Sequence, residues 1–292
     1  MQRREFLQKV FLSLWAFSSL QTQAQIPIIH PSNHWLPQID SKDYFGFLAF
    51  GDMGTGWKTQ YNLISQMATN SPNLYPAIIL LGDLIYPSAK ANLIEPNIIK
   101  PFAPLASKGF RFYPVWGNHD WIEQKALFVK QYFDAPDYYT YKIGSAQFWT
   151  LNSNEFDDKQ AYWLNSSLAS SLAAWKIVSL HHSPYSSGNV HHSNGHLIKN
   201  LCPILNKYKV DLCLSGHNHL YERTNKINNT VYVVSGGGSA SLHKFENTVD
   251  YPRAEIQSIY HYLRLRGNFN SLNLEAVDTN GQVFDRVLLT KH

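Results

Sequence analysis

Polar residues that can bind metal ions follow five short apolar segments of the sequence. They comprise two carboxylates, one phenol, one amide oxygen and three imidazoles, with no thiolate. Such mixed oxygen and nitrogen donors suit zinc, iron or manganese, whereas calcium prefers oxygen alone and a structural zinc site prefers sulfur. Seven donors exceed what one four-coordinate ion uses, so we expect two neighbouring ions. The seven residues are Asp52, Asp83, Tyr86, Asn118, His182, His217 and His219.

Two metal ions that share a carboxylate can promote displacement at phosphorus. A pair about 3.5–4 Å apart holds both the attacking and the leaving oxygen, and it lowers the pKa of a bound water toward about 7. The donor set therefore indicates hydrolysis of phosphate esters. The distribution of histidine supports this interpretation, because seven of the 13 histidines lie between positions 181 and 219.

Five apolar segments position these residues, because each segment stops directly before a polar turn. Continuous apolar runs of this length are typical of buried strands. The predicted strands cover residues 45–50, 77–81, 110–116, 175–180 and 210–214. The stretches between them mix apolar and polar residues and are predicted to be helical. The predicted helices cover residues 59–68, 121–133, 159–172 and 195–207.

Strands that alternate with helices predict crossover units with largely parallel pairing. Ligands of such sheets bind beyond the carboxyl ends of the strands, where all five polar turns lie, so we expect the turns to meet at one site. The C-terminal part differs, because residues 272–278 and 282–289 flank Asn280-Gly281 and predict an antiparallel hairpin. The whole pattern fits either one mixed sheet or two packed sheets flanked by helices.

The composition excludes several classes of protein. The 292 residues are 44% hydrophobic and 14% aromatic, which is too high for a disordered chain. The net charge of +4 is not gathered into basic runs, so we expect no nucleic acid as a structural partner. No apolar stretch reaches the roughly 18–20 residues of a membrane-spanning helix. Cys202 and Cys213 cannot build a disulfide scaffold; two separate buried thiols are expected, and a bridge between them stays open.

The N-terminus has the layout of an export signal. Arg3, Arg4 and Lys9 form a basic region, residues 10–20 are apolar, and small residues precede Gln25. The paired arginines resemble a bacterial twin-arginine signal, and an ordinary secretory signal is the alternative. We therefore expect residues 1–24 to be removed, residues 25–292 to form a single catalytic domain, and the protein to be periplasmic or secreted.

The ordered motifs resemble those of the metallophosphoesterase superfamily and, within it, the small single-domain purple acid phosphatases. The resemblance covers residues 44–238 and implies an α/β fold, a four-layer α/β/β/α sandwich of two mixed β-sheets flanked by helices. Five motifs in family order carry it, whereas any one of them alone would be weak. They are Gly51-Asp-x-Gly54, Gly82-Asp-x-x-Tyr86, Gly117-Asn-His-Asp120, His182-x-Pro184 and Gly216-His-x-His219.

The resemblance also implies two sets of metal ligands that share Asp83. The first set would bind Fe(III) and consists of Asp52, Asp83, Tyr86 and His219. The second set would bind divalent Fe, Zn or Mn and consists of Asp83, Asn118, His182 and His217. In the family the tyrosinate bound to Fe(III) gives the purple colour; an ordinary half-buried aromatic is the alternative for Tyr86. His181 directly precedes the predicted ligand His182 and is an alternative ligand.

Three further histidines match positions that act on the substrate in the family. His119 would contact the substrate phosphate, and His191 would bind phosphate or protonate the leaving group. His192 could share the role of His191, and solvated loop residues are the alternative for both. Arg223 is either a phosphate clamp or, at least as readily, part of a structural ion pair with Glu222 or of a nearby backbone contact.

The resemblance implies a metal-dependent acid phosphatase. It would hydrolyse small-molecule phosphate monoesters by in-line attack of a metal-bound hydroxide. A phosphodiesterase or nucleotide hydrolase that uses the same dinuclear site is one alternative. A metal- or phosphate-binding module without turnover is the alternative from another functional class, and the presence of His119 and His191 speaks against it.

Overall fold

The computed structural model describes residues 44–70 and 75–291. The predicted export signal at residues 1–24 lies outside the described residues. In the described parts of the chain, no helix combines the length and apolar character needed to cross a membrane.

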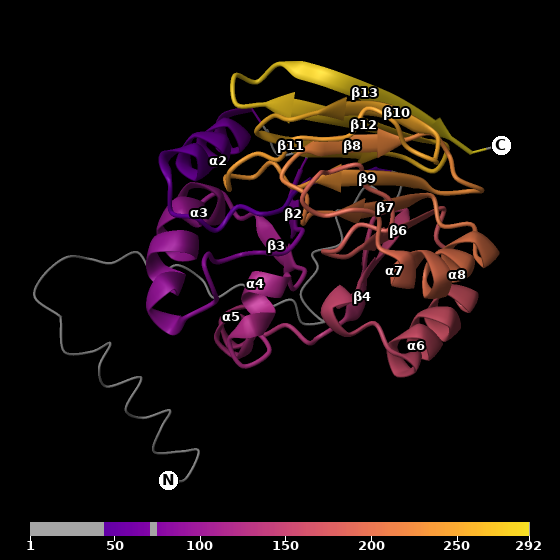
Figure 1. Cartoon of the computed structure of the whole chain (residues 1–292), viewed down its shortest axis with the longest axis horizontal. Coiled ribbons are helices and arrows are strands. Elements are labelled where there is room, and N and C mark those ends of the chain that lie inside the picture. The colour runs from indigo at the N-terminus through magenta and orange to yellow at the C-terminus, as the bar shows by residue number, and fades with distance from the viewer. Residues whose placement is uncertain (1–43, 71–74, 292) are drawn as a thin grey trace, which may run out of the picture.

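Two mixed β-sheets form the centre of the molecule (Figure 1). In spatial order, the six-stranded sheet consists of β13 (Val283–Thr290), β12 (Ser271–Asp278), β11 (His261–Gly267), β1 (Phe45–Phe50), β2 (Ala77–Leu80) and β3 (Arg111–Pro114). The seven-stranded sheet consists of β10 (Arg253–Gln257), β8 (Tyr221–Thr224), β9 (Val231–Ser235), β7 (Leu212–Ser215), β6 (Trp175–Ser179), β5 (Ala146–Thr150) and β4 (Tyr139–Ile143).

The main hydrophobic core lies between the two sheets. It joins buried residues of β1, β2 and β11 to buried residues of β5, β6, β7 and β9. One contact across the sheets is the edge-to-face pair of Phe47 and Phe148, whose ring centroids are 4.9 Å apart. The inward-facing apolar residues therefore hold the sheets face to face, and their burial explains why the predicted strands are continuously apolar.

Helices cover the outer faces of both sheets (Figure 1). Leu63 and Met67 of α2 (Lys58–Asn70) and Leu105 of α3 (Lys100–Ala106) belong to the main core. A second core lies under α6 (Asp158–Ala169), α7 (Gly195–Asn200) and α8 (Cys202–Lys207), where buried leucines meet Trp149 and Val178 of the seven-stranded sheet. The result is the predicted four-layer α/β/β/α sandwich.

The strand pairing agrees with the predicted topology. Strands β1, β2 and β3 pair in parallel, as do β5, β6, β7 and β9. The C-terminal hairpin is confirmed, because β12 and β13 pair antiparallel. Gly281 in its turn has a φ of +82°, a conformation that glycine adopts without strain. All five predicted polar turns therefore begin at carboxyl ends of parallel strands.

Two predicted helices are interrupted. The helix predicted over 121–133 is two helices, α4 (Asn118–Ile122) and α5 (Leu127–Phe133). Gln124, Lys125 and Ala126 between them all have left-handed backbone, with φ of 51°, 54° and 61°. The helix predicted over 195–207 divides at Leu201, one residue before Cys202-Pro203, because proline has no N–H to continue the hydrogen-bond ladder.

The helical segment at 91–106 was not predicted. It consists of the 3₁₀ turn Ala91–Leu93, the π-helical turn Glu95–Ile99 and α3.

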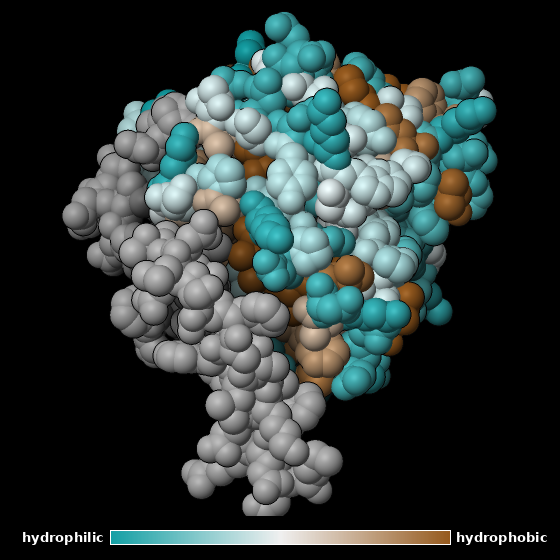
Figure 2. Space-filling view, turned by 90° about the vertical axis from the view of Figure 1, so that its left-hand side faces the viewer, coloured by the Kyte–Doolittle hydropathy of each residue, from teal (hydrophilic) through white to brown (hydrophobic). Residues whose placement is uncertain are grey.

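Figure 2 shows one side of the molecule, where hydrophilic and intermediate residues cover most of the described surface and hydrophobic residues show between them in smaller areas. Among the described residues, most large apolar side chains are buried in the two hydrophobic cores.

Candidate metal centre

Three of the predicted ligands have strained backbone. Asp52 follows β1, Asp83 follows β2 and His217 follows β7, and their φ angles are 60°, 53° and 69°. A left-handed conformation costs a residue other than glycine roughly 1–2 kcal/mol. Such strain persists where the surrounding structure enforces it, and it is concentrated at functional sites. The strand ends therefore point these three side chains in directions that an unstrained turn would not give.

Three predicted ligands converge on the phenol oxygen of a fourth, Tyr86. This oxygen lies 2.8 Å from Oδ2 of Asp83, 3.1 Å from Oδ1 of Asp52 and 3.1 Å from Nε2 of His219. Nδ1 of His219 donates to the carbonyl oxygen of Ser241 at 2.7 Å, so the lone pair of Nε2 faces the cluster. The structure thus brings together all residues of the predicted first set.

A second cluster contains His181 rather than His182. Nε2 of His181 lies 3.0 Å from Oδ1 of Asn118, 3.2 Å from Nδ1 of His217 and 3.4 Å from Oδ1 of Asp83. Nδ1 of His181 donates to the carbonyl oxygen of Leu81 at 2.9 Å, which leaves Nε2 as the ring nitrogen with a free lone pair. Metal-binding histidines commonly donate their other ring N–H to a carbonyl in this way.

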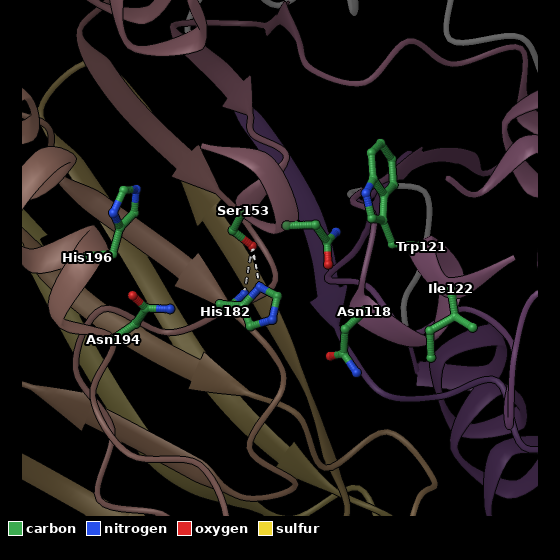
Figure 3. A pocket seen from close by; sticks show the side chains of 8 residues that line it. Asn118, Trp121, Ile122, Ser153, His182, Asn194 and His196 are labelled. Atoms are coloured by element: carbon green, nitrogen blue, oxygen red, sulfur yellow. Dashed lines mark hydrogen bonds between the residues drawn. The ribbon is translucent and has the colours of Figure 1, made fainter. Parts of the chain in front are cut away.

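His182, the residue predicted as the ligand, is held beside the cluster by Ser153. Its backbone N–H donates to Oγ of Ser153, and its Nδ1 lies 2.9 Å from the same oxygen (Figure 3). Its ring packs 4.4 Å from that of His217. The completely buried imidazole of His181, rather than that of His182, lies against the carboxylate of Asp83.

The buried carboxylates fit metal cations. Asp52 and Asp83 are 0% and 1% exposed, and among the described residues only histidines form ion pairs with them. Burying carboxylates without a compensating positive charge is unfavourable. Space beside them is preserved by glycine, because a Cβ at Gly117 would lie 2.1 Å from Oδ1 of Asp83 and one at Gly216 would lie 2.6 Å from Oδ2 of Asp52.

Burial and neighbouring charges shift the pKa values of two predicted ligands in opposite directions. Burial, together with the charges of Asp52 and Asp83, raises the pKa of Tyr86 far above its ordinary value. Burial and neighbouring imidazoles, His181 first, lower the pKa of His217 and keep its ring neutral. A neutral imidazole is the form that binds metal, and a cation between the carboxylates would favour the tyrosinate.

Asp120, the last residue of the Gly-Asn-His-Asp motif, joins two of the turns. Its carboxylate accepts the backbone N–H of Leu84 and of Gly117, each at 2.9 Å. Burial and the charge of Asp83 raise the pKa of Asp120 well above its ordinary value. Asp120 thus fixes the turn that carries Asp83 against the turn that carries Asn118, a positioning role that the sequence did not reveal.

The predicted substrate-binding histidines differ in their placement. Nε2 of His119 lies 3.9 Å from Oδ2 of Asp83, and its ring is 4.5 Å from that of Tyr86. His191 stacks on His217 with 3.8 Å between ring centroids. The side chain of His192 is 66% exposed and lies 3.9 Å from a carboxylate oxygen of Glu246. His119 and His191 therefore border the centre, whereas His192 lies at its rim.

Sequence reasoning missed His243. Its ring stacks on His219 at 4.0 Å with an interplanar angle of 20°, and its Nδ1 accepts the backbone N–H of His219. The centroid of its ring also lies 5.5 Å from that of His191. His243 comes from the loop after β9, where no motif marks it, so its contact with the site follows only from the fold.

Two other predictions are settled away from the centre. Arg223 of β8 makes two hydrogen bonds to Asp285 of β13, at 2.6 and 2.9 Å, so the predicted structural ion pair is confirmed, but its partner is Asp285 of the other sheet and not Glu222. Cys202 and Cys213 are both free thiols.

Residues 45–221 match the calcineurin-like phosphoesterase family, and this region contains every predicted metal ligand. The chain belongs to that family. Its relatives include purple acid phosphatase 7 of Arabidopsis thaliana, 25% identical over 84% of this chain and 86% of that protein. Purple acid phosphatase 17 of the same plant is 27% identical, with 84% of each chain covered. The predicted hydrolytic, metal-dependent phosphoesterase is thereby confirmed.

Solved structures confirm the predicted fold. Purple acid phosphatase PPD1 of yellow lupin superimposes with a TM-score of 0.75 at 20% identity, over 85% of this chain and 54% of the lupin chain. This chain therefore spans about half of the lupin protein. GAP50, the anchor in the inner membrane complex of Plasmodium, also gives a TM-score of 0.75 at 20% identity, over 86% of this chain and 90% of that chain. At this identity the two likenesses establish the fold alone.

Proposed function

We propose that the chain hydrolyses phosphate monoesters at a centre of two metal ions. The observation that carries the proposal is the position of Asp83 between two donor clusters. Its Oδ2 faces Tyr86 at 2.8 Å, and its Oδ1 faces His181 at 3.4 Å. A carboxylate shared in this way is the arrangement by which two ions are held close together.

The proposed ligands differ from the initial assignment at one residue. The first ion, Fe(III), would be held by Asp52, Asp83, Tyr86 and His219. The second ion, divalent Fe, Zn or Mn, would be held by Asp83, Asn118, His181 and His217. When bound, such ions lower the pKa of water and neutralise phosphate oxygens, which is the chemistry that phosphate ester hydrolysis requires.

The remaining roles belong to side chains that border the centre. His119 is placed to contact a substrate phosphate, because its Nδ1 is fixed by the carbonyl oxygen of Pro87 at 2.7 Å while its Nε2 faces Asp83. His191 is the proposed proton donor to the leaving alcohol. His192 would assist only from the rim.

The first test compares a monoaryl with a diaryl phosphate on metal-loaded protein. We expect faster hydrolysis of the monoester; a clear preference for the diester would favour the phosphodiesterase alternative. The fold also occurs in GAP50, an anchor in the inner membrane complex of Plasmodium, so a binding module is the alternative to an enzyme. Failure to hydrolyse any phosphate ester from about pH 4 to about pH 9, with both metals present, would identify a binding module instead.

We further propose export of the protein to the periplasm or the medium after removal of residues 1–24. The support is the basic and apolar pattern of that segment. N-terminal sequencing of the mature protein tests the cleavage site. Replacement of Arg3 and Arg4 by lysine should block export if the twin-arginine route is used, and should leave it intact if the signal is an ordinary one.

A further inference from the structure

A cavity of about 540 Å³ opens beside the second donor cluster (Figure 3). Its lining includes Asn118, a proposed metal ligand, and His182, whose ring lies 4.4 Å from that of His217. Its volume falls within the roughly 300–1,000 Å³ typical of pockets that bind small molecules. The cavity is therefore large enough for the organic part of a substrate whose phosphate lies at the metal centre.

One side of the cavity is apolar. Trp121 and Ile122 form it, and Figure 3 shows them across the cavity from Asn194 and His196. Ile122 is 67% exposed, although it is a large hydrophobic residue. Trp121 and Ile122 are the last two residues of α4. The left-handed turn that begins at Gln124 prevents the helix from continuing, so the side chains at the edge of the cavity are those of the helix end.

The opposite side offers a hydrogen-bond donor. Oδ1 of Asn194 accepts the backbone N–H of Leu197 at 3.1 Å and so caps α7. This leaves the Nδ2 amino group of Asn194 directed toward His182 and the cavity (Figure 3). His196 is already engaged through both ring nitrogens, with Phe156 and Asn200, and serves as a wall.

The lining contains no charged side chain. The ammonium groups of Lys125 and Lys130 lie 5.9 and 5.1 Å from the centroid of the Trp121 ring. Each is already paired with a carboxylate, Lys125 with Glu155 and Lys130 with Asp137. Among the described residues that line the cavity or lie over Trp121, a second anionic group on a substrate would find no unpaired cation, and desolvating such a group without one is unfavourable.

We propose that this cavity is the leaving-group subsite and that it selects an uncharged aromatic ring carrying a polar substituent. The ring would pack on Trp121 and Ile122, and the substituent would accept a hydrogen bond from Asn194. The inference rests on the proposed function, since it presumes that the phosphate is held at the metal centre. Such a subsite would favour simple aryl monoesters over nucleotides with several phosphates, because the nucleotides carry further anionic groups.

The test measures binding of two non-hydrolysable ligands to the metal-loaded protein by calorimetry. Phenylphosphonate should bind up to about tenfold more tightly than methylphosphonate, because only the former places a ring against Trp121. Trp121→Ala should remove most of this difference while leaving methylphosphonate unchanged. Ile122→Ala is the second variant, and because Ile122 is exposed, its truncation should leave the stability of the fold unchanged. Phe269→Ala, at a 48% exposed aromatic away from the cavity lining, is the matched control and should change neither affinity.

A second comparison addresses the charge. Phenylphosphonate with a para-carboxamide should bind at least about tenfold more tightly than the isosteric para-carboxylate. Equal affinity for the phenyl and methyl ligands, equal losses in Trp121→Ala, or a preference for the carboxylate would each overturn the subsite.

Hydrolysis of phenyl phosphate by the same protein preparations distinguishes failure of the proposed subsite from failure of the proposed phosphatase function. Turnover without any preference for the ring overturns the subsite alone. Selective binding of phenylphosphonate without turnover of any ester overturns the proposed function and supports a ring-binding cavity at this position.

Discussion

Nε2 of His181 lies 3.4 Å from Oδ1 of Asp83, while Nδ1 of the same ring is held by a backbone carbonyl. The neighbouring His182 is held by Ser153 instead. Two adjacent histidines therefore have different environments at the end of one strand, and only one of them meets a buried carboxylate.

This difference predicts the metal content of two matched variants. His181→Ala should lose the second metal, and its metal affinity should fall by more than the about 10–100-fold expected when only an outer-sphere partner is removed. His182→Ala should keep both metals. Elemental analysis of the folded proteins distinguishes the two; loss of metal in His182→Ala with retention in His181→Ala would restore the initial assignment.

Tyr86→Phe tests the proposed iron site. The phenol oxygen contacts both carboxylates and His219, so its removal should abolish a broad visible absorption band of the iron-loaded protein while leaving the fold intact. The visible spectrum and the iron content are measured together. A band that persists with the same intensity in the variant would show that no tyrosinate binds the iron.

Gly117→Ala tests whether space beside Asp83 is needed. The backbone of Gly117, with a φ of −87°, is accessible to alanine, but the added Cβ would lie 2.1 Å from Oδ1 and 2.2 Å from N of Asp83. Displacement of this carboxylate by about 1 Å should lower kcat about 10²-fold. Gly195→Ala is the control, since a Cβ there meets nothing within 4 Å. Similar kinetics in both variants would contradict the prediction.

His191→Ala tests the proposed proton donor. Loss of a general acid should lower the rate by about 10²–10⁴-fold for an alkyl phosphate, whose leaving group needs a proton. An aryl phosphate with an acidic phenol should be affected much less. Steady-state kinetics with both substrates measure the difference, and an equal loss on both would argue for phosphate binding alone.

His261 predicts a loss of stability in acid. Burial lowers the pKa of this imidazole to about 4, and its ring nitrogens are engaged by Ser235 and the carbonyl oxygen of Ile259. The unfolded chain, with a histidine pKa of about 6.5, binds the proton first, so the stabilisation is complete above pH 6.5 and is lost as the pH falls toward 4. The slope attributable to this residue is at most about 1.4 kcal/mol per pH unit.

Chemical denaturation across this pH window, for the protein and for His261→Gln, measures that slope. The variant should be less stable at neutral pH and should lose less free energy of unfolding on acidification. Parallel curves for the two proteins would show that another group is responsible.

Local motifs at strand ends predicted most of the donor clusters. Asp52, Asp83, Asn118, His217 and His219 lie in the turns that follow buried strands, so the strand pattern alone places them at one edge of the sheets. The His-x-Pro spacing favoured His182 over His181, but adjacent side chains leave a strand in opposite directions, and a shift of one residue exchanges them.

Features that depend on tertiary contacts were beyond the sequence. His243 reaches the centre from a loop without a motif, and Ser153 reaches His182 from a segment 29 residues away. The interruption after Ile122 was also missed, because Gln124, Lys125 and Ala126 are ordinary helix formers that the fold holds in left-handed conformations.

The donors of the centre are divided between the two sheets. Asp52, Asp83 and Asn118 follow strands of the six-stranded sheet, whereas His181 and His217 follow strands of the other. Metal binding should therefore cross-link the two sheets and raise the free energy of unfolding. A chelator should lower this free energy as well as abolish turnover. The same metal ions would then support catalysis and stabilise the packing of the two sheets, so activity and stability should depend on metal concentration together.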